Sequence, residues 1–293
     1  MQNFKSGFAA IIGKPNVGKS TLLNIILGEK LSIVSPKPQT TRQAVKGVYS
    51  DEVRQIVFLD TPGFLQPKYL LQEKMLKYLF DSLEGVDIII FITDAKTYPT
   101  DYDEKLLEII KNSKVPKIAL LNKVDLVQKP NVEKGMELLA KYNFETIMPA
   151  SFTNFFNVPN FIKTLDTYLP FGQPFYNPED ISDQGMRFFA QEIIREKIFL
   201  SYSQEIPYST TVVVENYNED DSKVEIIANI WLERASQKPI VLGKNGDKIK
   251  KIRIEAEKEI HSIVGKRVKL HLWIKIKHNW RKKKNALKEF GFK

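Results

Sequence analysis

The segment Gly13–Ser20, which reads GKPNVGKS, is the feature that most constrains how this chain can fold. A glycine, four residues and then Gly-Lys-Ser is the pattern of a phosphate-binding loop. The apolar run Phe8–Ile12 before the loop predicts a strand, and the pattern of Lys19–Leu27 after it predicts a helix. In that setting, the amide hydrogens of the loop and of the helix start point at a phosphate chain. The sequence therefore predicts a nucleotide site at the end of the first strand.

The residues of this loop have distinct expected roles. Lys19 is expected to reach the β- and γ-phosphates, and the Ser20 hydroxyl is expected to bind magnesium. The full set that we expect around the phosphates is Gly13, Lys14, Pro15, Asn16, Val17, Gly18, Lys19, Ser20, Thr21 and Gly63.

A second motif, Asp60-Thr61-Pro62-Gly63, follows the apolar run Gln55–Leu59. An aspartate at the end of a strand is well placed to hold magnesium through a water molecule, and the Gly63 amide can contact a γ-phosphate. The motif therefore predicts a site for the nucleotide together with its metal ion.

A third motif, Asn122-Lys123-Val124-Asp125, follows the apolar run Lys117–Leu121. The Asp125 carboxylate can accept hydrogen bonds from both N1–H and N2–H₂ of guanine, and adenine lacks that donor pair. Alone, the motif is also compatible with a solvated loop. After the two preceding motifs, in this order, it indicates GTP.

The first 169 residues alternate short apolar runs with amphipathic stretches. This alternation predicts an α/β domain with a mostly parallel sheet and helices on both faces, in which ligands bind at the carboxyl ends of the strands. The further strands expected are Val45–Tyr49, Ile88–Thr93 and Glu145–Met148, and the further helices are Tyr69–Leu83, Asp101–Asn112, Val132–Tyr142 and Val158–Tyr168.

The pattern changes after residue 169. Residues 170–183 contain three prolines and read as a linker, whose aromatic residues Phe171, Phe175 and Tyr176 suggest that it packs on the protein. Residues 184–293 predict the order helix, strand, strand, helix, loop, helix, strand, followed by a final helix that starts at Arg281. We expect a GTPase domain over residues 1–169, the linker, and an α+β domain of the type II KH class over residues 184–293.

Charge is distributed unevenly along the chain. Residues 234–293 hold 19 Lys+Arg and 5 Asp+Glu, a net charge of +14, whereas the whole chain has a net charge of +9. A segment this basic indicates a polyanionic partner, with nucleic acid ahead of an anionic membrane. The chain has no cysteine, which excludes disulfides and thiolate chemistry.

The basic segment contains Gly243-Lys244-Asn245-Gly246 between two predicted helices. Gly-x-x-Gly in this position is the loop with which KH domains clamp the backbone of single-stranded RNA. The residues expected to contact RNA are Gly243, Lys244, Asn245, Gly246, Lys248, Lys250, Lys251 and Arg253. Trp273 and Trp280 can in principle stack on bases, but we interpret Trp273 as core packing and Trp280 as the anchor of the final helix.

The chain as a whole resembles the Era family of bacterial GTPases. Beyond the three nucleotide motifs, the marks of the resemblance are Gln39-Thr40-Thr41-Arg42, Glu192–Lys197, Pro207-Tyr208-Ser209, Glu233-Arg234, Ser236-Gln237-Lys238 and Leu270-Trp273-Lys275-Lys277. The resemblance implies a GTPase fused to a KH domain that binds the 3′ end of small-subunit ribosomal RNA. It also implies an RNA-competent GTP state and a released GDP state.

The resemblance extends the expected site. Magnesium is expected to be held by Ser20, by Asp60 through water, and by Thr41, with Thr40 a near equal. The switch residues are Thr40, Thr41, Asp60, Thr61, Pro62, Gly63 and Phe64, and the guanine-binding residues are Asn122, Lys123, Asp125, Ser151 and Phe152.

Three positions of this site need separate comment. Phe64 stands where Ras-like enzymes carry a water-orienting glutamine, so we expect either slow intrinsic hydrolysis or another group that positions the water. Asn16 is either a potassium ligand or a turn residue. Ala150-Ser151-Phe152 departs from the usual Ser-Ala-x of the guanine loop, which leaves the geometry of that loop open.

Taken together, these patterns predict a magnesium-dependent GTPase whose nucleotide state controls RNA binding during maturation of the small ribosomal subunit. We expect a cytoplasmic monomer. One alternative is an RNA-binding KH protein whose nucleotide domain is only structural or senses GDP. Another is a GTPase at the inner face of the membrane, and weak membrane association is compatible with RNA binding.

Overall fold

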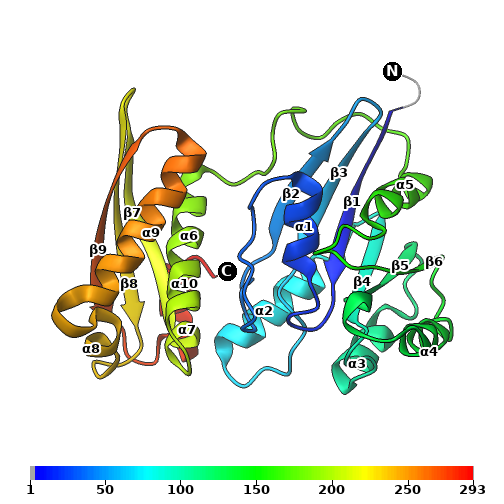
Figure 1. The fold of residues 1–293 in the computed structure, drawn as a ribbon, viewed down its shortest axis with the longest axis horizontal. Coiled ribbons are helices and arrows are strands. Elements are labelled where there is room, and N and C mark those ends of the chain that lie inside the picture. Colours follow the sequence, from blue (N-terminus) through cyan, green and yellow to red (C-terminus); the bar gives the residue numbers. More distant parts are fainter. Residues whose placement is uncertain (1–3, 293) are drawn as a thin grey trace. The chain divides into compact units, whose positions relative to one another are not determined.

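The computed structural model describes residues 4–292, and these form two compact units (Figure 1). The first unit contains the chain up to Ser32, Thr41–Gln66 and Met75–Asp183. The second contains Ile33–Thr40, Pro67–Lys74 and the chain from Gln184 onward.

The first unit is built on a six-stranded sheet with the strand order β2-β3-β1-β4-β5-β6. All neighbouring strands are parallel except β2 and β3, which are antiparallel, so the expected mostly parallel sheet is confirmed. The strands are β1 (Lys5–Ile12), β2 (Val45–Ser50), β3 (Arg54–Asp60), β4 (Ile88–Asp94), β5 (Lys117–Asn122) and β6 (Thr146–Pro149).

Helices cover both faces of this sheet (Figure 1). They are α1 (Lys19–Leu27), α2 (Leu70–Asp81), α3 (Asp101–Ile110), α4 (Lys129–Leu139) and α5 (Val158–Tyr168), with a short 3₁₀ turn, η1 (Val124–Leu126). Every residue of β4 is buried, as expected for a parallel strand with helices on both sides. One apolar cluster joins β4 to α3 and α4 through Phe91, Leu106, Leu107 and Leu139.

The proline-containing segment packs on the first unit, as its aromatic residues suggested. The Phe175 ring lies 4.8 Å from the Phe8 ring, centroid to centroid. The buried side chain of Gln55 accepts hydrogen bonds from the Phe175 and Tyr176 amides at 2.7 and 3.0 Å. Its own amide group donates to the Tyr176 carbonyl at 2.9 Å. Because both ends of the Gln55 amide are satisfied by backbone, this segment is held like a further layer of the fold.

The second unit carries a three-stranded sheet of order β7-β8-β9, in which β7 and β8 are antiparallel and β8 and β9 are parallel. Helices α6 and α9 pack against each other and against the sheet, and their apolar sides form its core with Ile194, Ile226, Ile252 and Leu270. The elements are α6 (Met186–Ser201), α7 (Ile206–Ser209), β7 (Thr210–Glu219), β8 (Lys223–Leu232), α8 (Gln237–Leu242), η2 (Lys244–Gly246), α9 (Asp247–Val264), β9 (Arg267–Ile276), η3 (Trp280–Lys282) and α10 (Lys284–Glu289).

Two expectations for the second unit were wrong. The final helix does not start at Arg281, because the chain first makes the 3₁₀ turn η3 and enters α10 only at Lys284. Trp273 is not core packing, because 61% of its surface is exposed. Trp280 is fully buried as the anchor of this region, and its indole N–H donates to the Ser209 carbonyl at 2.9 Å.

The two tryptophans allow a matched test of this assignment. Trp280→Ala removes a buried ring and a hydrogen bond, and we expect it to lower the free energy of unfolding by about 3–5 kcal/mol. Trp273→Ala removes an exposed ring and should cost less than about 1 kcal/mol. Urea denaturation of the full chain followed by circular dichroism measures both. Equal losses for the two variants would contradict the assignment.

Candidate functional site

The three nucleotide motifs meet at one edge of the first sheet. The phosphate loop follows β1, Asp60 ends β3, and Asn122 ends β5. Because these strands are parallel, their carboxyl ends lie on the same side of the sheet. Motifs separated by more than 100 residues therefore form a single site.

The phosphate loop needs glycine where the chain packs most closely. Gly18 has φ 109°, and a Cβ atom there would lie 2.5 Å from the Asn122 amide nitrogen and 3.0 Å from the Phe152 ring. Asn16 also has a left-handed backbone, with φ 64°, which agrees with its interpretation as a turn residue. Val17 is buried, and Thr21 lies in the first turn of α1.

Lys19 is buried under this loop. Its ammonium group donates to the carbonyls of Gly13 and Lys14 at 3.1 and 3.0 Å. Burial lowers the pKa of Lys19 to about 8, although the nearby Asp60 carboxylate acts in the opposite direction. A phosphate chain in the loop would supply the negative charge that this lysine lacks.

The side chain of Lys14 is engaged elsewhere. Its ammonium group forms a 2.6 Å ion pair with the buried Asp103 carboxylate, which also accepts hydrogen bonds from Thr93 and Thr100. Lys14 therefore offers its backbone to a phosphate, and its charge fixes the loop to α3.

Ser20, Thr41 and Asp60 converge beside the loop. The Ser20 and Thr41 hydroxyls are 3.0 Å apart and lie 2.8 and 3.2 Å from Asp60 Oδ2. Asp60 is fully buried, and burial raises its pKa while Lys19 opposes that shift. Asp60 Oδ1 is buried without a hydrogen-bond partner among the described residues. Two hydroxyls and a carboxylate with an unused oxygen are the hard oxygen donors that suit Mg²⁺.

The guanine motif divides into two structural residues and one exposed group. Asn122 donates to the Val17 carbonyl at 2.8 Å and accepts from the Phe152 amide at 3.2 Å, so it links the phosphate loop to the loop after β6. Lys123 donates to the Asn16 carbonyl at 2.7 Å and pairs with Asp94 at 2.6 Å. Asp125 is exposed on η1, where its carboxylate has no partner among the described residues.

The unusual loop after β6 is tied to its neighbours by backbone hydrogen bonds, although Phe155 and Asn157 in it have left-handed φ values of 55° and 62°. The Ala150 amide donates to the Leu121 carbonyl at 2.8 Å, and Ser151 and Phe156 form an isolated bridge. Ser151 and Phe152 are both 2% exposed. Phe152 therefore packs under Gly18, and Ser151 and Phe152 can present only main-chain groups to a base.

The switch residues have different surroundings. The Thr61 hydroxyl donates to the Ile11 carbonyl at 2.7 Å and is buried. Phe64 packs in the apolar cluster of α3 and α4, and its amide donates to the Gly13 carbonyl at 3.1 Å. A Cβ atom on Gly63 would lie 2.8 Å from the Pro15 nitrogen, so Gly63 runs directly beside the phosphate loop. Of the two threonines, it is the Thr41 hydroxyl that lies beside Ser20 and Asp60.

The segments that adjoin Thr41 and Gly63 in sequence contact the rest of the second unit. Arg195 of α6 donates to the Thr40 carbonyl, and Lys37 donates to the Phe199 and Tyr202 carbonyls at the end of α6. The Arg281 guanidinium lies 4.8 Å from the Tyr69 ring centroid and donates to its hydroxyl at 3.4 Å.

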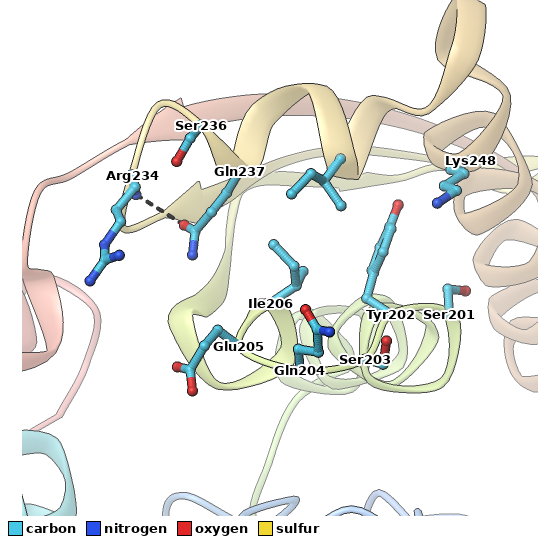
Figure 2. Close-up of a pocket in the computed structure, with 11 residues that line it drawn as sticks. Ser201, Tyr202, Ser203, Gln204, Glu205, Ile206, Arg234, Ser236, Gln237 and Lys248 are labelled. Carbon is cyan, nitrogen blue, oxygen red and sulfur yellow. Dashed lines mark hydrogen bonds between the residues drawn. The ribbon is translucent and has the colours of Figure 1, made fainter.

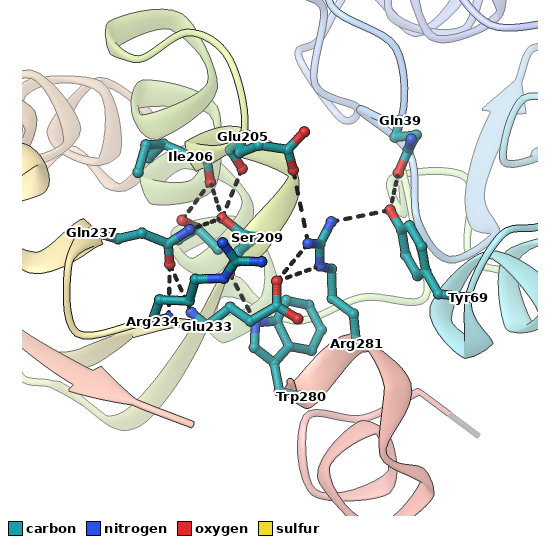
Figure 3. A network of polar contacts seen from close by, with 11 residues as sticks. Gln39, Tyr69, Glu205, Ile206, Ser209, Glu233, Arg234, Gln237, Trp280 and Arg281 are labelled. Carbon is teal, nitrogen blue, oxygen red and sulfur yellow. Dashed lines mark hydrogen bonds and ion pairs between the residues drawn. The ribbon is translucent and has the colours of Figure 1, made fainter. Parts of the chain in front are cut away.

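Within the second unit, a polar network extends from Arg281 to Glu233, Gln237 and Ser209 (Figure 3). Arg281 pairs with the buried Glu233 carboxylate. The Gln237 side chain accepts from the Glu233 and Arg234 amides at 3.0 Å and donates to the Ser209 hydroxyl at 2.7 Å. The residues around Glu233 and Ser209 therefore set the position of the Arg281 side chain. Their spacing in the sequence does not reveal this role.

The Gly-x-x-Gly loop forms a sharp link between α8 and α9. Gly243 and Gly246 have φ 75° and 78°, and Asn245 between them has φ 53°. Lys244, Lys248 and Lys250 are exposed and make no ion pair among the described residues. Lys251 and Arg253 each lie 3.8 Å from a glutamate one turn later, Glu255 and Glu257. The loop thus has unpaired lysines on both sides, while the Gly243 and Gly246 amides donate to the Pro239 and Gly243 carbonyls at 3.0 and 3.4 Å.

Comparisons with known proteins agree with this architecture. The family model described as 50S ribosome-binding GTPase matches residues 8–123, and the KH domain model matches residues 205–281. The GTPase Era of Staphylococcus haemolyticus strain JCSC1435 is 42% identical over 294 residues, which cover 100% of this chain and 98% of that protein.

Two solved structures have the same fold over their whole length. One is a variant of Era from Aquifex aeolicus bound to GDP·AlF4⁻, and the other is Era in complex with MgGDPNP and nucleotides 1506–1542 of 16S ribosomal RNA. Each is 37% identical to this chain with a TM-score of 0.95, and 99% of both chains is covered.

The lowered pKa of Lys19 predicts how nucleotide affinity depends on pH. Bound phosphates favour the charged lysine, so binding is strongest below pH 8 and weakens as Lys19 loses its proton. Between pH 7 and 8.5 the charged fraction falls about fourfold, and we expect the affinity for GDP to fall about fourfold. Titration calorimetry of the unsubstituted chain and of Lys19→Gln tests this. An unchanged affinity, or the same decline in Lys19→Gln, would contradict it.

Proposed function

Because this chain belongs to the Era family of GTPases, we propose that it is a GTP-hydrolysing switch that binds the 3′ end of small-subunit ribosomal RNA. RNA binding is gated by GTP versus GDP, and the switch assists maturation of the small ribosomal subunit. The chain acts as a monomer in the cytoplasm, and weak association with the inner face of the membrane accompanies RNA binding without replacing it. Among the described residues, no helix is both long and apolar enough to cross a membrane.

The observation that carries the hydrolytic part is the convergence of Ser20, Thr41 and Asp60 next to the buried Lys19. A purely structural nucleotide domain gains nothing from burying a carboxylate with an unpaired oxygen, since such burial costs free energy. Magnesium held by Ser20, Thr41 and Asp60 would neutralise charge on the phosphates. The structural alternative is therefore not favoured.

The chain's own groups supply positioning and electrostatic stabilisation. Lys19 and the loop amides hold the phosphates, and a water molecule attacks the γ-phosphate in line with the leaving oxygen. The side chain of Phe64 is packed in the core and orients no water. Intrinsic turnover is accordingly slow, and RNA binding raises it by ordering the switch residues.

Guanine selection rests on Asp125. Its exposed carboxylate accepts from N1–H and N2–H₂, while Asn122 and Lys123 hold the loops around the base. The backbone of Ser151 and Phe152 completes the base site, because both side chains are buried away from it.

Gating rests on chain segments that begin at the nucleotide and end in the second unit. Thr40 is the last residue of Ile33–Thr40, and Thr41 lies at the metal site. Gly63 is followed by Pro67–Lys74, which carries Tyr69 to Arg281. A change in the position of Thr41 or Gly63 when the γ-phosphate is lost would therefore displace the segments that contact Arg195 and Arg281. These segments supply a physical route that couples the nucleotide state to the second unit.

The central experiment is GTP turnover with and without single-stranded RNA of the small-subunit 3′ end. We expect magnesium-dependent turnover that rises about tenfold or more with RNA. Asp60→Asn should lower it about a hundredfold, because a carboxylate at the metal site is lost. Asp101→Asn, an exposed carboxylate at the start of α3, is the matched control and should have no effect. Turnover that is absent, or that is indifferent to magnesium, would contradict the proposed activity.

The same assay tests whether Asn16 also holds a monovalent cation that neutralises phosphate charge. If it does, turnover is faster in potassium than in sodium at equal ionic strength, and Asn16→Gly removes the difference. Glycine is the suitable replacement because it keeps the left-handed backbone of this position. Equal rates in the two salts would leave Asn16 a turn residue only.

A further inference from the structure

A pocket of about 310 Å³ lies on the second unit beside the Gly-x-x-Gly loop (Figure 2). It is bounded by the end of α6, the start of α7, the turn before α8, and Lys248 in the first turn of α9. This volume is at the lower end of small-molecule sites and suits one nucleotide rather than a folded partner.

The floor of the pocket is held rigidly. The buried Tyr202 hydroxyl donates to the Val241 carbonyl at 2.6 Å. Gln237 is fixed by its three hydrogen bonds to the Glu233 and Arg234 amides and the Ser209 hydroxyl. The apolar lining comes from Ile206, which is buried, and Ile240, which is half exposed. A flat base can therefore enter without the cost of ordering the site.

The rim of the pocket is polar and lacks partners. The Arg234 guanidinium forms no hydrogen bond or ion pair among the described residues, and the Lys248 ammonium only lies 5.8 Å from the Tyr202 ring centroid. Some other cations of this unit are ion-paired, such as Lys197 with Glu259 and Lys266 with Glu219. The side chains of Ser201, Ser203, Gln204 and Ser236 likewise have no partner in the part of the chain that the structure describes.

The charges suit a phosphodiester strand. Arg234 and Lys248 lie at opposite ends of the pocket (Figure 2). The one carboxylate in the lining, Glu205, lies 3.8 Å from the Arg281 guanidinium and is partly neutralised by it. The pocket therefore offers two cations for phosphates, and hydroxyls and an amide for the edge of a base.

The position of Lys248 connects this pocket to the loop. Successive helix residues are about 100° apart, so Lys248 and Lys250 point to opposite sides of α9. Arg253, on the side of Lys250, pairs with Glu257, which accepts from the Leu270 amide of β9. Lys248 faces away from that strand and lines the pocket instead. A strand clamped by Gly243–Gly246 can thus continue past Lys248 toward Arg234.

We propose that this pocket is a second RNA subsite, which takes one nucleotide of the single strand held by the Gly-x-x-Gly loop. The base lies against Ile206 and Ile240, and the flanking phosphates contact Lys248 and Arg234. The inference rests on the proposed RNA binding and adds to it a site outside the Gly-x-x-Gly loop.

The test compares three variants of the full chain. Arg234→Ala removes the unpaired cation, and Ser236→Phe fills the pocket without loss of a helix cap, because Ser236 makes no capping hydrogen bond. Lys238→Ala is the matched control, since Lys238 is an exposed cation of the same segment that does not line the pocket. Circular dichroism and the urea midpoint of the second unit should be unchanged in all three, which verifies its folding, and GTP turnover without RNA should also be unchanged.

We expect Arg234→Ala and Ser236→Phe to weaken binding of single-stranded 3′-end RNA about tenfold, and Arg234→Ala to lower the salt dependence by about one released ion. Lys238→Ala should stay within about twofold. RNA that carries 4-thiouridine should crosslink to residues 201–206 or 236–240. Pyrimidine mononucleotides, which the guanine site rejects, should bind weakly, because the loop supplies the rest of the affinity.

The outcomes separate the two proposals. If Arg234→Ala and Ser236→Phe behave like Lys238→Ala and crosslinks stay within residues 243–253, the pocket proposal is overturned while RNA binding stands. If pyrimidine mononucleotides bind as tightly as the RNA, the pocket is a free-nucleotide site and the subsite is overturned as well. If the unsubstituted chain binds no RNA, both proposals fall.

Discussion

The buried Asp60 carboxylate is the constraint on which the nucleotide site depends. It ends a central strand, is fully buried, and leaves one oxygen without a partner among the described residues. Lys19, Ser20 and Thr41 offset part of the cost of that burial but not all of it. The fold thus holds a pair of opposite charges at the end of its sheet, and a metal ion with phosphates completes it.

The second feature is how the chain is divided between its two units. Ile33–Thr40 and Pro67–Lys74 belong by their contacts to the second unit, although the nearby Thr41 lies beside Asp60 and Gly63 lies beside the phosphate loop. Arg195 and Arg281 hold these segments through a carbonyl and a tyrosine ring. The proposed gating of RNA binding by nucleotide therefore has a direct covalent route, because each of these segments continues along the chain toward the phosphate loop or Asp60.

Sequence patterns predicted the helices and strands well where a continuous apolar run or a helical apolar period marks the buried residues. The apolar runs fixed the strands of the first sheet, and Lys19–Leu27 and Val158–Tyr168 were predicted to the residue. Trp273 was wrongly assigned to the core although the sequence held the answer. Val268, Leu270, Leu272 and Ile274 alternate on the inner face of β9, which places Trp273 on the other face.

Other features could not be predicted, because they depend on contacts between distant segments. The ion pair of Lys14 with Asp103 and the position of the Thr41 hydroxyl beside Asp60 follow from the sheet order. The basic run at Arg281 predicted the start of a helix. In the structure, the Arg281 side chain pairs with Glu233, which directly follows β8, and lies against the Tyr69 ring. No local pattern contains these partners.

The most direct test of the account is the affinity for single-stranded RNA of the small-subunit 3′ end, measured at one fixed salt concentration with a non-hydrolysable GTP analogue and with GDP. We expect tighter binding with the analogue by about tenfold or more, which corresponds to about 1.4 kcal/mol of coupling. Equal affinity in the two nucleotide states would contradict it, because the segments shared between the two units would then transmit nothing.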